Sequence, residues 1–138
     1  MVKFLAGSKG EGKTNKLIGL ANENLTLTDG HLVFIDDDKR HIHDLHRDIR
    51  FVEVEKGLLA NHREFTAFLH GVLSQNSDIA HVYIDGLSNI IENFCETNEL
   101  PPFFKTLEAL SEKENVNFTV SIDCEKEKLP PAVATILI

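Results

Sequence analysis

Residues 7–14 read GSKGEGKT and decide the fold of the first part of the chain. Three of these eight residues are glycine, and a Lys-Thr pair follows the last glycine directly. The apolar run VKFLA precedes the stretch at residues 2–6, and KTNKLIGLANENL follows it with Leu17 and Ala21 at helical spacing. A short apolar run favours a buried strand, and the second spacing favours an amphipathic helix. The sequence therefore predicts a strand, a glycine-rich turn and a helix in direct succession.

The glycine-rich turn fits the pattern G-x-x-x-x-G-K-[ST], which is suited to binding phosphate groups. Glycines let successive N–H groups point into one concavity, and the helix adds its positive N-terminal end. An ordinary glycine-rich turn is the alternative, but a place between a strand and a helix is the context that the pattern requires. The lysine then contacts nucleotide phosphates and the threonine hydroxyl binds Mg²⁺. The predicted nucleotide-binding residues are Gly7, Ser8, Lys9, Gly10, Glu11, Gly12, Lys13 and Thr14, with Lys13 also catalytic and Thr14 also a metal ligand.

The rest of the chain alternates short apolar runs with stretches of helical character. Strands are predicted at residues 2–6, 32–36, 51–54, 81–85, 118–122 and 135–138. Helices are predicted at residues 13–25, 61–75, 90–96 and 103–114. This alternation is typical of an α/β fold built on a mainly parallel sheet. Residues 1–138 are of the length of one domain, and one domain is expected.

A second metal ligand is needed, because Mg²⁺ is usually bound by one or two carboxylates besides hydroxyl and water ligands. Ligands of open α/β sheets gather beyond the carboxyl ends of the strands. Asp85 ends the apolar run of residues 82–84 and is the predicted carboxylate for Mg²⁺. The alternative role for Asp85 is to cap the helix that follows.

Charge and composition exclude several classes of protein. A net charge of -8, from 14 basic and 22 acidic side chains, argues against a broad nucleic-acid surface and against binding to anionic membranes. Cys95 and Cys124 are far apart and match no zinc spacing, so neither a zinc site nor a disulfide scaffold is expected. No run is long enough for a signal peptide core or a membrane span. A reducing cytoplasm is the expected location.

The stretch KRHIHDLHRDIR contains three histidines, His41, His43 and His46. Their spacing matches no specific zinc signature, although such density raises a metal hypothesis. A surface loop close to the nucleotide is the favoured interpretation, and sensing of pH is a further one. Tyr83, inside an apolar run, is expected to pack in the core.

With both motifs placed, the chain resembles the P-loop NTPases, and its order of elements resembles their RecA-like branch. The resemblance implies a three-layer fold with strand order 3-2-4-5-1-6. It also implies a catalytic carboxylate after the second strand, where FIDDD places Asp38 at the position of the base, with Asp36 and Asp37 as alternatives. Asp123 lies where related ATPases place a sensor of the γ-phosphate.

The chain is also similar to small stand-alone bacterial ATP-binding proteins that are labelled twitching-motility ATPases by similarity. The matching stretches are GSKGEGKTNKLIGLAN, LVFIDDDKRHIHDL, IRFVEV and VYIDGLSNII. In an oligomer, one arginine could reach the γ-phosphate of a neighbouring subunit. The arginines are Arg40, Arg47, Arg50 and Arg63.

Three functions are compatible with these motifs. The first is Mg-ATP binding with weak or partner-stimulated ATPase activity, completed by a protein partner or a second copy. The second is a nucleotide-binding interaction module without turnover, which an aspartate in place of glutamate at Asp38 would suit. The third is a small-molecule or nucleoside kinase, although Gly86 follows Asp85 where that group has a glutamate. ATP is favoured over GTP because no N-K-x-D follows a strand.

Overall fold

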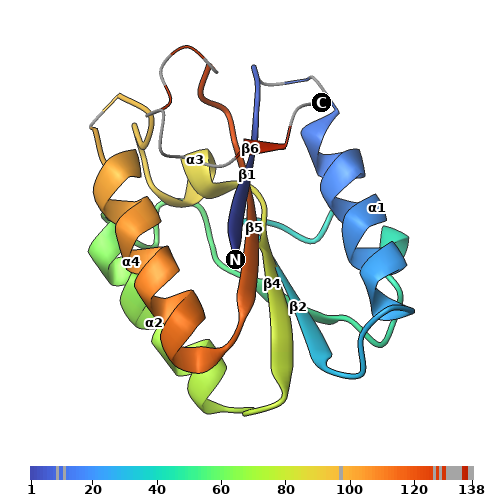
Figure 1. Ribbon diagram of the computed structural model, residues 1–138. Coiled ribbons are helices and arrows are strands. Elements are labelled where there is room, and N and C mark those ends of the chain that lie inside the picture. The colour runs from blue at the N-terminus through green and yellow to red at the C-terminus, as the bar shows by residue number, and fades with distance from the viewer. Residues whose placement is uncertain are drawn as a thin grey trace.

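The computed structural model describes residues 1–8, 10, 12–96, 98–125, 127, 129 and 135–136. One parallel sheet forms its centre, and helices cover both faces (Figure 1). Helices α2 (His62–Ser74) and α4 (Leu100–Glu114) lie on one face, and α1 (Lys13–Leu25) lies on the other. The predicted α/β class with a mainly parallel sheet is therefore confirmed.

The strands run in the same direction, so all of their carboxyl ends meet at one edge. They are β1 (Val2–Ala6), β2 (His31–Asp36), β3 (Arg50–Glu53), β4 (Ile79–Ile84), β5 (Asn117–Ile122) and β6 (Thr135–Ile136). Their order across the sheet is β3-β2-β4-β5-β1-β6, and every neighbouring pair is parallel. Residues 137–138, which were expected to extend the last strand, lie outside the described residues.

Two predicted helix boundaries need correction. The helix expected at residues 90–96 is wrong: α3 (Leu87–Ile90) ends at the first of these residues, and residues 91–96 form a bend and turns. Asn93 there has a positive φ of 58°, which a right-handed helix does not allow. The last helix begins at Leu100 and not at the expected residue 103, because Pro101 and Pro102 are tolerated in its first turn. Backbone N–H groups there have no acceptor within a helix, so proline, which has no N–H, loses no hydrogen bond. Within the described part of the chain, no helix is long and apolar enough to cross a membrane.

The two faces of the sheet are packed differently. The larger apolar cluster lies under α2 and α4 and includes Phe65, Phe103 and Phe118. The smaller one lies under α1 and joins Leu17 and Ala21 to residues of β2 and β4, including the buried Tyr83. The α1 side of the sheet therefore has the smaller apolar cluster of the two.

Cys95 and Cys124 form a disulfide, with their Cα atoms 5.6 Å apart. The sequence expectation of no disulfide is wrong. The pairing is invisible in the spacing, since 29 positions separate the two residues and only the fold brings them together. The bond links the turn that precedes α4 to the residue immediately after Asp123.

Candidate functional site

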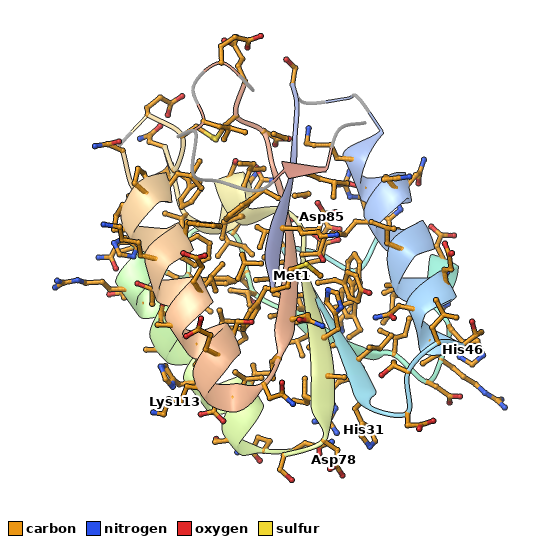
Figure 2. All side chains as sticks on the ribbon, in the orientation of Figure 1. Met1, His31, His46, Asp78, Asp85 and Lys113 are labelled. Atoms are coloured by element: carbon orange, nitrogen blue, oxygen red, sulfur yellow. A yellow bond between two sulfur atoms is a disulfide. The ribbon has the colours of Figure 1, made fainter. Side chains whose placement is uncertain are left out.

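The candidate site lies at the carboxyl edge of the sheet, where a cavity of about 180 Å³ opens. Figure 2 shows Asp85 there, in the space between the sheet and α1. Ligands of open parallel sheets bind at this edge. The described lining residues are Gly10, Gly12, Lys13, Thr14, Asp36, Asp37, Arg40, His41, Asp85, Gly86, Leu87, Ser88, Asn89, Ser121 and Asp123.

The glycine-rich loop enters α1 through left-handed backbone. Gly10 and Gly12 have φ values of 89° and 80°, which only glycine adopts without strain. Among the residues that the structure describes, no side chain caps the N-terminus of α1. The first backbone N–H groups of the helix, which have no acceptor within it, are therefore free to bind an anion at the cavity. Lys9 and Glu11, both predicted to bind nucleotide, lie outside the described residues.

Lys13 is a buried cation at the start of α1, with only 5% of its surface exposed. Its ammonium group donates to the carbonyl oxygens of Gly7 and Ser8, at 2.9 and 2.7 Å. A carboxylate oxygen of Asp123 lies 2.8 Å from the same nitrogen. These three described partners of Lys13 are all oxygen acceptors, so phosphate oxygens are chemically suited to replace them.

Thr14 and Asp85, the two predicted Mg²⁺ ligands, are in contact. The Thr14 hydroxyl donates to Asp85 Oδ2 at 2.8 Å. Asp85 is 6% exposed, its other carboxylate oxygen accepts from the Ser121 hydroxyl, and its backbone N–H donates to the Ile35 carbonyl. Hydroxyl and carboxylate oxygens are the ligands that Mg²⁺ prefers. The donor set therefore fits this cation, with Thr14 and Asp85 as ligands and Ser121 orienting the carboxylate.

Asp36 and Asp37 bring further carboxyl groups to the same cavity. Burial, a hydrogen bond with Asp37 and repulsion from Asp85 raise the pKa of Asp36 to about 8. Asp36 therefore carries a proton at neutral pH. Asn89 donates to the Asp37 carboxylate at 3.2 Å. A Cβ atom on Gly86 would meet this carboxylate, and Gly86 has a φ of 70°, a left-handed conformation that favours glycine at this turn.

Asp38, the predicted base, takes a different position. Its carboxylate accepts from the Arg40 Nε group at 2.9 and 3.1 Å, and it is not among the described residues that line the cavity. A hydrogen bond from the Arg40 backbone N–H, followed by contact with its side chain, lowers the pKa of Asp38. Asp38 is thus paired with Arg40, and the members of the FIDDD stretch that line the cavity are Asp36 and Asp37.

The histidine-rich stretch does not assemble a metal site among the described residues. The only described group of three or more potential metal ligands is Asp36, Asp37 and Asp38. His41 lines the cavity and lies 3.2 Å from an Asp44 carboxylate oxygen, whereas His46 lies 3.7 Å from one of Asp48. Arg40 is the arginine that contributes to the described lining; Arg47, Arg50 and Arg63 do not.

Sequence reasoning missed Ser121, Ser88 and Asn89 as lining residues. For Ser121 a signal was present: in NFTVSID, polar residues alternate with Phe118, Val120 and Ile122. Strand residues two apart share a face, so the alternation places Ser121 and Asp123 on the side opposite the larger core. Ser88 and Asn89 follow the strand in a helical turn, for which the residue pattern gave no comparable signal.

A comparison with models of protein families found no match for this chain. A search of curated proteins found none either.

Proposed function

We propose that this protein is a Mg-ATP-binding P-loop NTPase of the RecA-like branch, with weak or partner-stimulated ATPase activity. The observation that carries the proposal is the convergence of Lys13, Thr14 and Asp85 on one cavity at the carboxyl edge of the sheet. Two stretches 71 positions apart in sequence are joined there by the hydrogen bond between Thr14 and Asp85. The strand order, with β5 between β1 and β4, supports the RecA-like branch.

The glycine-rich loop would hold the phosphates, with Gly7, Ser8, Gly10 and Gly12 supplying backbone and the start of α1 supplying N–H groups. Lys13 would turn from Asp123 to the phosphate oxygens. The ammonium group is already held against the loop by two carbonyls, so a small movement exchanges one anionic partner for another. The preference for ATP over GTP rests on the lack of a guanine-reading motif in the sequence.

Mg²⁺, when bound, neutralises charge that develops on the phosphates during transfer of the γ-phosphoryl group. Thr14 and Asp85 would hold it, and Ser121 would keep Asp85 in the orientation found here. The Thr14 hydroxyl and the Asp85 carboxylate oxygen, which now share a hydrogen bond, are the two oxygens that would hold the metal. This arrangement makes Asp85 more important for binding Mg-ATP than for binding ATP alone.

Activation of the attacking water is the weakest part of the site. Asp38 is paired with Arg40, and Asp36 is protonated at neutral pH. Asp37 is therefore the carboxylate at the cavity best suited to accept a proton, although Asn89 holds it. Slow intrinsic hydrolysis follows, and a protein partner or a second copy of the chain would have to release Asp38 from Arg40 or supply a base.

The same pair favours a second candidate function, a nucleotide-binding interaction module without turnover. If no partner separates Asp38 from Arg40, binding alone remains. A small-molecule or nucleoside kinase ranks below both, because Asp85 is followed by Gly86 where that group has a glutamate. Gly86 lies close to Asp36 and Asp37. The proposed function involves neither a nucleic acid nor a membrane. It includes a cytoplasmic location, where the Cys95–Cys124 disulfide would be open to reduction.

Calorimetric titration of the purified chain with Mg-ATP and Mg-GTP, beside the Lys13→Ala variant, tests the proposal. We expect saturable binding of Mg-ATP that is lost in the variant and weaker binding of Mg-GTP. Phosphate release measured on the same samples separates a slow ATPase from a module without turnover. Undiminished binding by the Lys13→Ala variant would refute the assignment of the loop.

A further inference from the structure

A second and larger cavity, of about 350 Å³, lies at the other end of α1. It is bounded by the C-terminal half of α1 and by the first residues of β1, β4 and β5. In Figure 2, His31 and Asp78 mark the amino edge of the sheet, and Asp85 marks the candidate nucleotide site toward the opposite edge. The two cavities share no described lining residue. The volume is within the range of small-molecule sites.

Four polar side chains form a connected network beside this cavity. Asn24 donates from its amide nitrogen to the Tyr83 hydroxyl at 2.9 Å, and the same nitrogen lies 3.3 Å from His81 Nδ1. His81 Nε2 lies 2.7 Å from the Thr119 hydroxyl. The His81 ring also stacks on the Tyr83 ring, with centroids 4.2 Å apart. Polar groups beneath a helix cost stability unless they are paired, so a network here needs an explanation beyond packing.

The protonation state of His81 fixes the direction of these bonds. Burial, followed by the nearby chain amine and Lys3, lowers the pKa of His81 to about 4, so the ring is neutral at pH 7. Both amide protons of Asn24 are used, which makes His81 Nδ1 an acceptor and Nε2–H a donor to Thr119. The Tyr83 and Thr119 oxygens each accept a bond, and neither donates its own proton to a described residue.

The spare donors match an anion. Lys3 lies on the rim, and none of the described carboxylates forms an ion pair with it. Its ammonium group and the hydroxyl protons of Tyr83 and Thr119 are thus three donors at one cavity that no described residue accepts, and Glu23 is the carboxylate that an anionic ligand would have to avoid in the described lining. Charged acceptors make the strongest hydrogen bonds with such donors, and a carboxylate accepts several at once.

The lining also offers aliphatic surface, from Leu20 of α1 and from Leu27 just beyond its C-terminal end, beside the polar residues Thr28 and Asn117. Leu27 is 75% exposed, which leaves an aliphatic surface in contact with water. An apolar ligand body would cover this surface while its anionic end met the three donors.

We propose that this cavity binds a small organic carboxylate with an apolar body, independently of the candidate nucleotide site. Tyr83 is the only tyrosine and the chain has no tryptophan, so intrinsic fluorescence reports this cavity specifically. Hexanoate is the probe, because it does not absorb where tyrosine does. Hexan-1-ol has the same apolar body without the charge and serves as the matched ligand.

Full-length protein is titrated with each ligand, and the Tyr83 emission is followed. We expect the Tyr83 emission to change saturably with hexanoate. Hexan-1-ol should bind about tenfold more weakly, because it cannot form the hydrogen bonds that a charged group forms. Lys3→Met should weaken hexanoate binding by about five- to tenfold. Lys105→Met removes an equal charge from the exposed face of α4, on the other side of the sheet, and should change nothing.

Thr119→Val keeps the shape of the side chain and removes one donor, so it should also weaken hexanoate binding. A flat fluorescence titration would overturn the proposal. So would equal affinities for hexanoate and hexan-1-ol, or equal effects of Lys3→Met and Lys105→Met, because either result would mean that no built anion site exists. Circular dichroism of each variant confirms that the fold is retained before the comparison is made.

Discussion

Breaking the Cys95–Cys124 disulfide should destabilise the fold substantially. The bond closes a loop with a sequence separation of 29 residues, which contains α4 and β5. Without it the unfolded chain gains the freedom of that loop, and the loop-entropy relation gives about 3.5 kcal/mol at 25 °C. A typical domain has a total stability of about 5–15 kcal/mol, so the change is a large fraction of the whole.

Urea unfolding of the same protein before and after treatment with a dithiol reductant measures this difference. With a slope of about 1.5 kcal/mol/M, the midpoint should fall by about 2 M on reduction. The slope itself should rise, because the reduced unfolded chain is less compact. A thiol count on each sample establishes that the bond is formed or broken.

The double variant Cys95→Ala and Cys124→Ala is the control, since its unfolding curve should not respond to the reductant. Cys124 is 4% exposed, so alanine at this position adds a packing loss that the reduced wild type does not have. Coincident curves for the oxidised and reduced wild type would refute the loop-entropy argument. A shift that persists in the double variant would assign the effect to the reductant instead of the bond.

Three further predictions concern the candidate nucleotide site. Asp85→Asn should weaken Mg-ATP binding by at least about tenfold while changing metal-free ATP binding far less, and equal losses in calorimetry would place Asp85 away from the metal. Asp123→Asn should strengthen ATP binding by about two- to fivefold, because it removes an anion that competes for Lys13; weaker binding would make Asp123 a contributor to the bound state. The raised pKa of Asp36 means that the folded state holds a proton that the unfolded state releases between about pH 4 and pH 8. The contribution of Asp36 to the free energy of unfolding should therefore be largest below about pH 4 and should fall as the pH rises to about 8. Asp36→Asn should remove that fall in urea unfolding measured across this range, and an unchanged pH profile would show that Asp36 ionises normally.

The α/β class and most element boundaries were predictable from local pattern. Apolar runs such as residues 2–6 and 118–122 mark strands, and the spacing of Leu17 and Ala21 marks α1. The order of the strands is not contained in such patterns, because it depends on which runs pair across long stretches of chain; the expected order came from the resemblance alone. The helix predicted at residues 90–96 was wrong because Ile91 and Phe94 lie three positions apart, a spacing that a buried helix face would also give. Both side chains are buried, but the backbone that carries them forms turns.

The candidate site was predictable to the extent that it is written in consecutive residues. The glycine-rich loop and the aspartate after an apolar run each carry a local signature. The contacts that adjust them do not: the Lys13–Asp123 pair and the Asp38–Arg40 pair depend on side-chain positions in the folded chain. Asp38 in particular has the expected sequence position for a base, but its carboxylate is held in an ion pair with Arg40, two residues away. Local sequence therefore predicts which groups reach the site, and the fold decides how they are paired.

Two neighbouring strands, β4 and β5, carry polar side chains on the α1 face of the sheet, and this feature links the two cavities. Polar residues alternate with apolar ones along two neighbouring strands and their ends, as His81, Tyr83 and Asp85 and as Thr119, Ser121 and Asp123. The apolar residues between them all belong to the larger core, which can stabilise the fold without help from the α1 face. Because burying polar groups costs free energy, these two polar rows, beside the smaller apolar cluster on the same face, are better suited to binding than to packing. Helix α1 covers both halves of this face, with Lys13 at one end and Asn24 at the other, so ligands at the two cavities would contact the same rigid element.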